Sequence, residues 1–506
     1  MSQPRFLLAD IVQWDIFANS LKYAFTPWPL FLMMLGTALG ITVGAIPGLT
    51  GAMLIALTLP LTFTMQSHDA LILLISMYVG SISGGLITAT LLRMPGTPAS
   101  IMTTLDGYPM ACSGQPGRAL GLGINASFIG GLISWVFLLL LAKPMSQWSN
   151  QLRHIDFFAL VLMALVLIAT VSGKSLVKGI LAGFLGMLAT MPGIDPTTSK
   201  PRMTFGFTEL NNGFELLPVL IGLFAISQII KDIIAIDQNP TAVKPSWFGA
   251  FLSLRDWSRQ AINLIRSSLI GTWIGILPGI GANIGSVLAY VTARNMSSKP
   301  EQFGKGSEEG IVASEAANNA TVGGALIPLI SMGIPGSVID AILLGALVIH
   351  KLQPGPLLFD SNPDIVYTII TTTLVANCFM FVFMLLSVGL LSKLMHVPRW
   401  LLIPIILVFC VVGSFALNNR MFDVWVMLAF GTIGFGMERL KIPLAPFVIG
   451  FVLAPIAETR LGAALQHSNG NLLPILNPSR PALYFCLIAA ILLAWPLIRR
   501  WRVYNK

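Results

Sequence analysis

Charged residues are scarce in this chain of 506 residues, and their scarcity excludes a water-soluble globular protein. Only 10% of the residues are Asp, Glu, Lys or Arg, whereas 55% are hydrophobic and the mean hydropathy is +0.80. A soluble domain carries about 25% charged residues. Because so much apolar surface cannot be hidden from water in a core, lipid has to be part of the solvent. We therefore predict an all-α polytopic membrane protein.

Cysteine and histidine are also few, which argues against disulfides, metal sites and the commoner catalytic centres. The chain has four cysteines and five histidines, all scattered. The cysteines are Cys112, Cys378, Cys410 and Cys486, and no two lie close enough in sequence to suggest a disulfide or a metal pair. The HExxH motif and the Walker loop are missing. We therefore expect no catalytic residue, no metal site and no cofactor, and we do not expect an enzyme.

The charges that are present indicate membrane topology. The 30 basic residues exceed the 21 acidic ones, and in a membrane protein such an excess marks cytoplasmic loops more often than nucleic-acid binding. Two basic groups stand out, namely Lys231, Lys244, Arg255, Arg259 and Arg266 around one long loop, and Arg499, Arg500, Arg502 and Lys506 at the end. We place both in the cytoplasm, and we expect no nucleic-acid partner.

Apolar segments of about 20 residues predict about 11 to 14 crossings. The stretches near 51–65, 281–293 and 336–351 are short and are expected to be half-helices or re-entrant arms. The N-terminal residues lack the pattern of a signal peptide and predict an interfacial helix. The expected layout is an N-terminal helix (1–26), a first transmembrane repeat (27–236), a cytoplasmic linker (237–261), a second repeat (262–498) and a basic cytoplasmic tail (499–506).

A helix-breaking phrase occurs twice in the chain. GITVGAIPGLTGA (40–52) and GTWIGILPGIGAN (271–283) share two glycines and a Pro-Gly pair at the same spacing. A second phrase follows in each half, GGLITATLLRMPGTPAS (84–100) and GGALIPLISMGIPGSVID (323–340), in which the gap from Gly-Gly to Pro-Gly differs by one residue. Internal repeats with broken helices are frequent in secondary transporters, often with inverted topology. We expect two repeats, inverted in the membrane.

The breaks suggest a binding site for an anion. Proline interrupts a helix, glycine permits unusual backbone angles, and the freed backbone groups need polar partners inside a bilayer. A helix that starts after a break offers unpaired N–H groups and a positive dipole end to a carboxylate. The alternative is that these residues only kink helices or allow close packing. The candidate substrate-binding residues are Pro47, Gly48, Thr50, Gly51, Arg93, Pro95, Gly96, Thr97, Ser100, Pro278, Gly279, Gly281, Asn283, Pro335, Gly336 and Ser337.

A second set of polar residues suggests cation coupling. Asn318, Asn319 and Thr321 carry oxygens of the kind that replace the hydration shell of sodium, although hydrogen bonding between helices explains them equally well. A charge at membrane depth costs about 3 kcal/mol on insertion scales, so Arg93 and Asp340 are functional candidates. Arg93 can pair with a substrate carboxylate. Asp340 can hold a proton or a cation, or pair with Arg93, and the coupling ion is Na⁺ or H⁺.

The chain resembles the large membrane subunit of the tripartite tricarboxylate transporters. The resemblance lies in GAIPGLTGAMLIALTLPLTF, GGLITATLLRMPGTPASIMTTLDGYPM, GILPGIGANIGS, EAANNATVGGALIPLISMGIPGS, LLGALVIHKLQPGPLLF and IPLAPFVIGFVLAPIAE. It implies a multi-pass secondary transporter of the bacterial inner membrane that takes an organic di- or tricarboxylate from a periplasmic solute-binding protein. The same resemblance implies that this transporter is driven by a cation gradient and works with a small four-span membrane subunit. It also implies that the breaks at Pro47, Pro95, Pro278 and Pro335 line the substrate site.

Two positions depart from the family pattern, and other classes of protein remain as alternatives. The position of Arg93 is commonly neutral and that of Asp340 small or hydroxylated, which leaves open a carboxylate other than citrate, or a zwitterionic or cationic compound. The other classes are a membrane-embedded enzyme and a channel-type subunit. By analogy with other repeat-built transporters, we expect an elevator-type motion and, with it, a homodimer of the membrane complex.

Overall fold

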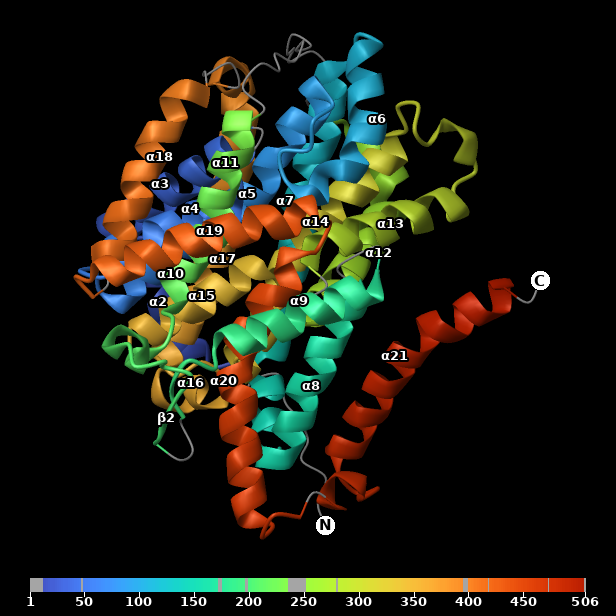
Figure 1. Cartoon of the computed structure of the whole chain (residues 1–506). Helices are drawn as coiled ribbons and strands as arrows, with labels where there is room; N and C mark the ends of the chain where they lie inside the picture. The colour runs from blue at the N-terminus through green and yellow to red at the C-terminus, as the bar shows by residue number, and fades with distance from the viewer. Residues whose placement is uncertain are drawn as a thin grey trace.

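The chain is helical almost throughout, as its composition predicts. The computed structural model describes residues 12–46, 49–171, 175–195, 199–234, 252–278, 281–394, 399–416, 418–471 and 473–504. Within these residues the strands are limited to β1 (Gly193–Ile194) and β2 (Pro201–Arg202), which pair antiparallel. The fold is therefore a bundle of helices, in which the elements of the two halves of the chain lie side by side (Figure 1).

The first half of the chain ends before the long polar loop. Its helices are α2 (Trp14–Ala24), α3 (Pro27–Gly44), α4 (Gly51–Thr58), η1 (Leu59–Thr62), α5 (Ser67–Leu92), η2 (Pro98–Ser100), α6 (Ile101–Cys112), α7 (Pro116–Asn150), α8 (His154–Val171), α9 (Leu176–Ala189), η3 (Thr208–Asn212), α10 (Leu216–Ile221), η4 (Gly222–Ile226) and α11 (Ser227–Ile234). Because η4 is a π-helical turn, α10, η4 and α11 form one continuous helix with a local widening.

The second half repeats the alternation of broken and continuous helices. Its helices are α12 (Leu254–Ile276), α13 (Gly281–Met296), η5 (Pro300–Gln302), α14 (Glu308–Met332), α15 (Val338–Ile349), α16 (Pro356–Ser361), α17 (Pro363–Leu394), α18 (Arg399–Ala416), α19 (Met421–Arg439), α20 (Leu444–His467), η6 (Leu473–Leu476) and α21 (Pro481–Tyr504). Helix α12 begins earlier than the predicted start at 262, because its first turns are charged and carry no hydropathy signal. Of the linker predicted at 237–261, residues 237–251 lie outside the described residues, and residues 254–261 belong to α12.

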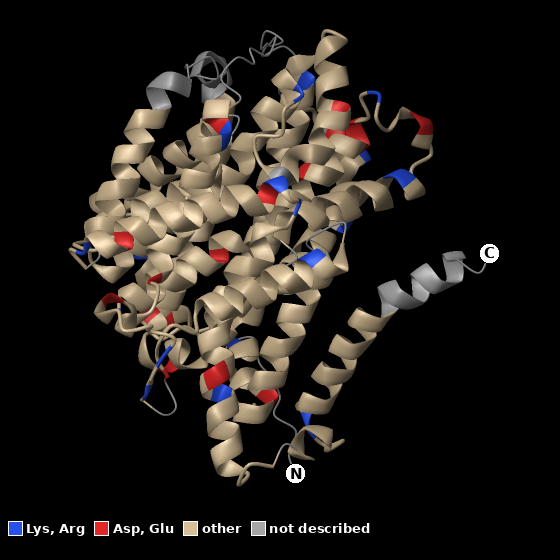
Figure 2. Cartoon of the chain, in the orientation of Figure 1, with Lys and Arg blue, Asp and Glu red and all other residues tan. Residues whose placement is uncertain are grey.

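Seven helices of the described chain are long and apolar enough to cross a membrane. This confirms the predicted all-α polytopic membrane protein. The predicted 11 to 14 crossings stay a prediction, because several segments are shorter or carry charges. Charged residues are few and lie mostly near helix ends and in connections, as the coloured ribbon of Figure 2 shows. Glu315 and Asp340, by contrast, are fully buried within the bundle.

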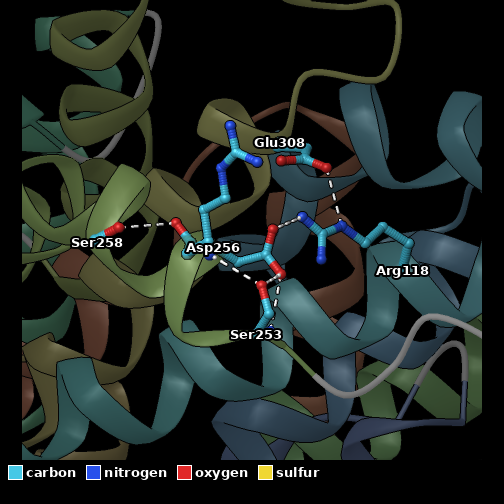
Figure 3. Close-up of polar contacts among 6 residues, drawn as sticks. Arg118, Ser253, Asp256, Ser258 and Glu308 are labelled. Carbon is cyan, nitrogen blue, oxygen red and sulfur yellow. Dashed lines mark hydrogen bonds and ion pairs between the residues drawn. The ribbon is translucent and has the colours of Figure 1, made fainter.

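Helix α7 links the two ends of the bundle. Its 35 residues correspond to about 52 Å of helix, more than the roughly 30 Å of a hydrocarbon core. At its start, Arg118 donates to Asp256 at 2.6 Å and to Glu308 at 2.9 Å, at the beginnings of α12 and α14 (Figure 3). Near its end, the Ser146 hydroxyl donates to the carbonyl of Pro356, at the start of α16. We call the first end the Arg118 face.

The opposite end, the Asp69 face, holds the starts of a different set of helices. Asp69, in the first turn of α5, accepts hydrogen bonds from Tyr23 at 2.9 Å and from Trp28 at 3.0 Å. Its neighbour His68 lies 2.8 Å from Asp364, in the first turn of α17. Since α16 and α17 also meet the end of α7, helices α3, α5 and α17 start from the Asp69 face. Helices α7, α12 and α14 therefore run in the opposite sense.

Glycines bring two pairs of helices into close contact at equivalent positions. A Cβ added to Gly40 on α3 would lie 2.4 Å from the carbonyl oxygen of Met77 on α5. A Cβ added to Gly271 on α12 would lie 2.3 Å from the carbonyl oxygen of Ala317 on α14. Without side chains at these positions the backbones can nearly touch, which is how helices associate in lipid. The glycines that precede each Pro-Gly pair thus allow close helix packing, and the Pro-Gly pair itself follows where the helix ends.

Candidate functional site

The first break of each half lies near the middle of the bundle. Gly44, at the end of α3, packs against the carbonyl of Ser81, and Gly275, near the end of α12, packs against that of Thr321. Ser81 and Thr321 are each near the midpoint of a long helix, α5 and α14. In both halves the chain therefore stops being helical beside the middle of a long helix, and the polar cavity that such breaks would line stays a prediction.

The second break of each half has the same backbone geometry. Helix α5 ends at Arg93 with φ 56° and ψ 22°, and α14 ends at Gly333 with φ 71° and ψ 26°. Both residues adopt the left-handed helical conformation. In each half the amide of the following residue donates to the carbonyl six residues earlier, from Met94 to Thr88 and from Ile334 to Pro328. Glycine adopts this conformation without strain, whereas an arginine side chain costs roughly 1–2 kcal/mol. The chain therefore carries an arginine at a position where the backbone conformation favours glycine.

After each left-handed residue the chain folds back onto the first break. A Cβ on Gly96 would lie 2.2 Å from the carbonyl oxygen of Gly44, and one on Gly336 would lie 2.9 Å from that of Gly275. In both halves the glycine that follows the proline of the second break packs against the glycine that lies three residues before the proline of the first break. Both breaks of each half therefore meet at one place, and a side chain larger than glycine would separate them.

The breaks of the two halves also meet each other. A Cβ on Gly281, at the start of α13, would lie 3.8 Å from the Ser337 side chain, at the start of α15. A Cβ on Gly51, at the start of α4, would lie 3.3 Å from the Ile339 side chain of α15. The starts of α4, α13 and α15 are thus in direct contact, and α13 also packs on η2, which precedes α6. Sequence-distant helix N-termini therefore converge.

The predicted substrate residues take different places around this convergence. Thr50 and Ser337 cap their helices by accepting from the amides of Met53 at 3.1 Å and Asp340 at 3.3 Å. Buried positions are held by Gly51, Gly96, Thr97, Ser100, Pro278, Pro335 and Gly336, while Gly281 is partly buried and Arg93, Pro95 and Asn283 are exposed. Thr97 and Ser100 share a hydrogen bond of 2.9 Å. Pro47, Gly48 and Gly279 lie outside the described residues.

Asp340 is a fully buried carboxylate without a hydrogen-bond partner. Its relative exposure is 0%, and neither side-chain oxygen accepts a hydrogen bond in the described structure. Its polar neighbours are Ser337 on its own helix and Tyr78 on α5, itself 2% exposed. A buried ionised carboxylate without a partner costs several kcal/mol. The site is thus chemically incomplete and suits a proton or a cation.

The three other predicted coupling residues divide into two groups. Asn319 accepts from the Ser83 hydroxyl at 2.6 Å, and the Thr321 hydroxyl donates to the carbonyl of Asn318 at 2.6 Å. These two side chains already have partners within the protein. The side-chain oxygen of Asn318 is buried and accepts no hydrogen bond. Among these residues the structure leaves the Asn318 and Asp340 oxygens available as ligands.

Glu315 is a second buried carboxylate, which the sequence did not assign to the site. It is 0% exposed and accepts hydrogen bonds from Thr103 on α6 and, at 3.3 Å, from Ser127 on α7. Thr103 also bonds Ser314 at 3.1 Å. The signal in the sequence was an acid within an apolar segment, but its hydroxyl partners are about 200 residues away and carry no pattern.

Arg93 and Asp340 do not pair. The Arg93 guanidinium lies 5.9 Å from the centre of the Tyr108 ring on α6, and the side chain is exposed. Among the described residues, no ion pair joins Arg93 to an acid. Of the roles considered for Arg93, pairing with Asp340 is thus not the arrangement in this structure. The exposed guanidinium is free to meet an anion.

The comparisons with known proteins identify the family. A family model described as "Tripartite tricarboxylate transporter TctA family" matches residues 30–449. The chain belongs to this family. As a TctA-family protein it is the membrane subunit of a transporter and not an enzyme, and it is a multi-pass membrane protein. The resemblance seen in the broken-helix segments is thereby confirmed.

Two relatives of this TctA-family chain come from Agrobacterium vitis. One is an uncharacterized 52.8 kDa protein of the TAR-I ttuC' 3' region, 32% identical over 493 residues, which cover 96% of this chain and 98% of the relative. The other is an uncharacterized protein of the TAR-II ttuC' 3' region, 33% identical over 234 residues, which cover 46% of this chain and 97% of the relative. No solved structure gives a significant match.

Proposed function

We propose that this TctA-family subunit is a secondary active importer that moves an organic di- or tricarboxylate across a bacterial inner membrane, coupled to a cation. Its partners are a small four-span membrane subunit and a periplasmic solute-binding protein that delivers the substrate. The observation that carries the proposal is the convergence of four mid-membrane helix breaks, two from each half of the chain. A binding pocket at half depth is what alternating access between two sides requires.

The opposite senses of the two halves support an inverted repeat. Helices α3 and α5 start from the Asp69 face, whereas α12 and α14 start from the Arg118 face, and each pair makes the same glycine contacts. We assign the Arg118 face to the cytoplasm because the basic loop that precedes α12 ends there. A pseudo-symmetric inverted pair allows the same packing to open toward either side, which supports the elevator-type motion that we propose.

The chemistry at the breaks supports an anionic substrate. The starts of α4, α6, α13 and α15 carry N-terminal amides and positive dipole ends, of which Thr50 and Ser337 cap one amide each and leave others for an anion. Small polar side chains, such as Thr50 and Ser337, stand at these starts. The nearby Arg93 adds a guanidinium, which binds carboxylates in bidentate fashion. A carboxylate therefore fits this site better than a neutral solute.

The buried oxygens of Asn318 and Asp340 support coupling to a cation. They lack partners in the described structure and lie on α14 and α15, the helices on the two sides of the second break. A proton on Asp340, or a sodium ion held by either oxygen, would remove the cost of burying an unpartnered acceptor. Cation binding and substrate binding would thus stabilise the same arrangement of the breaks.

Reconstitution tests the proposal. The subunit is placed in proteoliposomes with its small partner, and uptake of labelled citrate, succinate and betaine is measured with and without the binding protein, under a sodium or a proton gradient. Uptake of a carboxylate that needs both the binding protein and one gradient supports the proposal. Ion flux without the binding protein would instead indicate a channel, and turnover of a substrate without a gradient would indicate an enzyme.

A further inference from the structure

A large cavity lies away from the convergence of the breaks, on the Asp69 face. Its volume is about 870 Å³, within the range of small-molecule sites, and its walls come from α8, α15, α20, residues 190–194, Arg202 and residues 212–217. Pro356, whose carbonyl accepts a hydrogen bond from Ser146 near the end of α7, lines the cavity, so the cavity lies on the Asp69 face. Met332 and Gly333 line it as well, so the second break of α14 forms part of its wall.

One arginine in this wall is fully neutralised. Arg202 binds both carboxylate oxygens of Glu458, lies 3.5 Å from Asp195, and donates its Nε to the Met191 carbonyl at 2.8 Å. The guanidinium therefore has a bidentate partner and a second acid nearby. Its place is structural, because it ties the segment after α9 to α20.

A second arginine in the same wall has no acid partner. The Arg460 guanidinium lies 4.7 Å from the centre of the Phe157 ring, and its Nη1 is 3.2 Å from Nδ1 of His154. Because a guanidinium only donates hydrogen bonds, this histidine nitrogen must be the acceptor and unprotonated. No ion pair among the described residues includes Arg460. A half-buried cation therefore faces the cavity without a counterion.

We propose that this cavity receives the carboxylate released by the binding protein and that Arg460 is its anion-binding residue. The inference rests on the proposed function. Arginine binds carboxylates through two parallel hydrogen bonds, and Phe157 holds the guanidinium in place by stacking. From here the anion is separated from the converging helix starts by the second break, so that opening of this break would let it pass. The cavity is then the first station of the substrate on the periplasmic side.

A labelling experiment tests the charge of the cavity without relying on transport. Thr459, an exposed wall residue, is replaced by Cys in a background in which the four native cysteines are changed to Ser. The rates of modification by an anionic and by a cationic methanethiosulfonate reagent are compared. We expect Arg460→Gln to lower the anionic rate about fivefold and to raise the cationic rate about fivefold, so that their ratio falls, because one unit charge about 4 Å away in water changes each rate by that factor. Citrate should slow the labelling only when Arg460 is present. An unchanged ratio, or equal protection in both backgrounds, would overturn the proposal.

Uptake measurements complete the test. Arg460→Gln should raise the substrate concentration for half-maximal uptake about tenfold, a change of about 1.4 kcal/mol, with the maximal rate nearly kept. Arg460→Lys should restore part of the affinity, and Lys200→Gln, which removes an exposed charge outside the cavity, should change nothing. If wild-type uptake needs the binding protein but Arg460→Gln leaves the labelling ratio unchanged, the cavity proposal fails alone. If the labelling ratio falls but no carboxylate is taken up, the proposed function fails instead.

Discussion

Replacing Asp340 by Asn gives the sharpest test of cation coupling. The side chain is fully buried and neither of its oxygens accepts a hydrogen bond of normal geometry, although the Tyr78 hydroxyl and Ser337 lie close by. A bound proton or cation would therefore remove most of the cost of burying this charge. The Asn side chain has the same shape but cannot carry a charge or release a proton. Removing an uncompensated buried charge costs no stability, and we expect the free energy of unfolding to stay within about 1 kcal/mol of wild type. Coupled uptake should fall at least about 100-fold, which corresponds to about 2.7 kcal/mol.

The assay separates coupling from substrate binding. Gradient-driven uptake and gradient-independent exchange of labelled citrate are measured in the same proteoliposomes. Asp340→Asn should abolish the first and retain much of the second. The matched control is Asp69→Asn, which also removes a buried acid but loses one of the two hydrogen bonds from Tyr23 and Trp28, because Asn has a single acceptor oxygen. The control should destabilise the protein by about 1–3 kcal/mol and leave coupling intact.

Two results would refute this reasoning. Full gradient dependence in Asp340→Asn would show that the coupling ion binds elsewhere. A loss of stability of several kcal/mol would show that the Asp340 carboxylate makes interactions in the folded protein that this structure does not contain.

Three further substitutions test the packing, the Arg118 face and the breaks. Gly271→Ala should destabilise the protein by about 1–3 kcal/mol in thermal unfolding, since its Cβ would lie 2.3 Å from the Ala317 carbonyl oxygen. The control Gly436→Ala in α19 places its Cβ in open space and should be neutral or stabilising. Equal effects of the two substitutions would contradict the contact. Arg118 and the Ser253 cap hold the pKa of Asp256 well below its usual range, so this carboxylate adds stability above about pH 4 that is lost as the pH falls further. Asp256→Asn should therefore reduce the loss of stability below pH 4, by no more than about 1 kcal/mol. An unchanged acid-unfolding profile would argue against the interaction. Arg93→Asn keeps a residue that tolerates the left-handed conformation but removes the charge, and it should shift uptake among carboxylates; an unchanged substrate range and affinity would show that Arg93 does not tune specificity.

The helices and their breaks could be predicted from the sequence because lipid imposes a simple pattern. Long apolar segments became helices, and the described breaks fall at Pro95, Pro278 and Pro335, as proline and glycine dictate. The predicted alignment of one half of the chain with the other was less accurate around the second break. The sequence aligned the two Gly-Gly pairs, with a difference of one residue. The structure gives Gly84 and Gly324 equivalent contacts, because packing against a neighbouring backbone, and not the doublet, selects the glycine.

The polar interior could not be predicted in the same way. Asn318, Asn319 and Thr321 are adjacent in sequence and of similar chemistry, yet only the Asn318 oxygen lacks a partner, which depends on Ser83 and on the helix carbonyls. The wall around Arg460 is built from segments about 300 residues apart. Such arrangements depend on tertiary packing, which hydropathy and spacing do not encode.

The central claim is that the breaks of the two halves form one carboxylate site at mid-membrane depth. A cryo-EM map of the reconstituted complex with the transported carboxylate bound tests it most directly. The account predicts density for the anion between the starts of α4, α6, α13 and α15, within hydrogen-bond distance of backbone amides near Thr50 or Ser337. Substrate density at another place, or breaks that face hydrocarbon with no solvent-filled space between them, would contradict it.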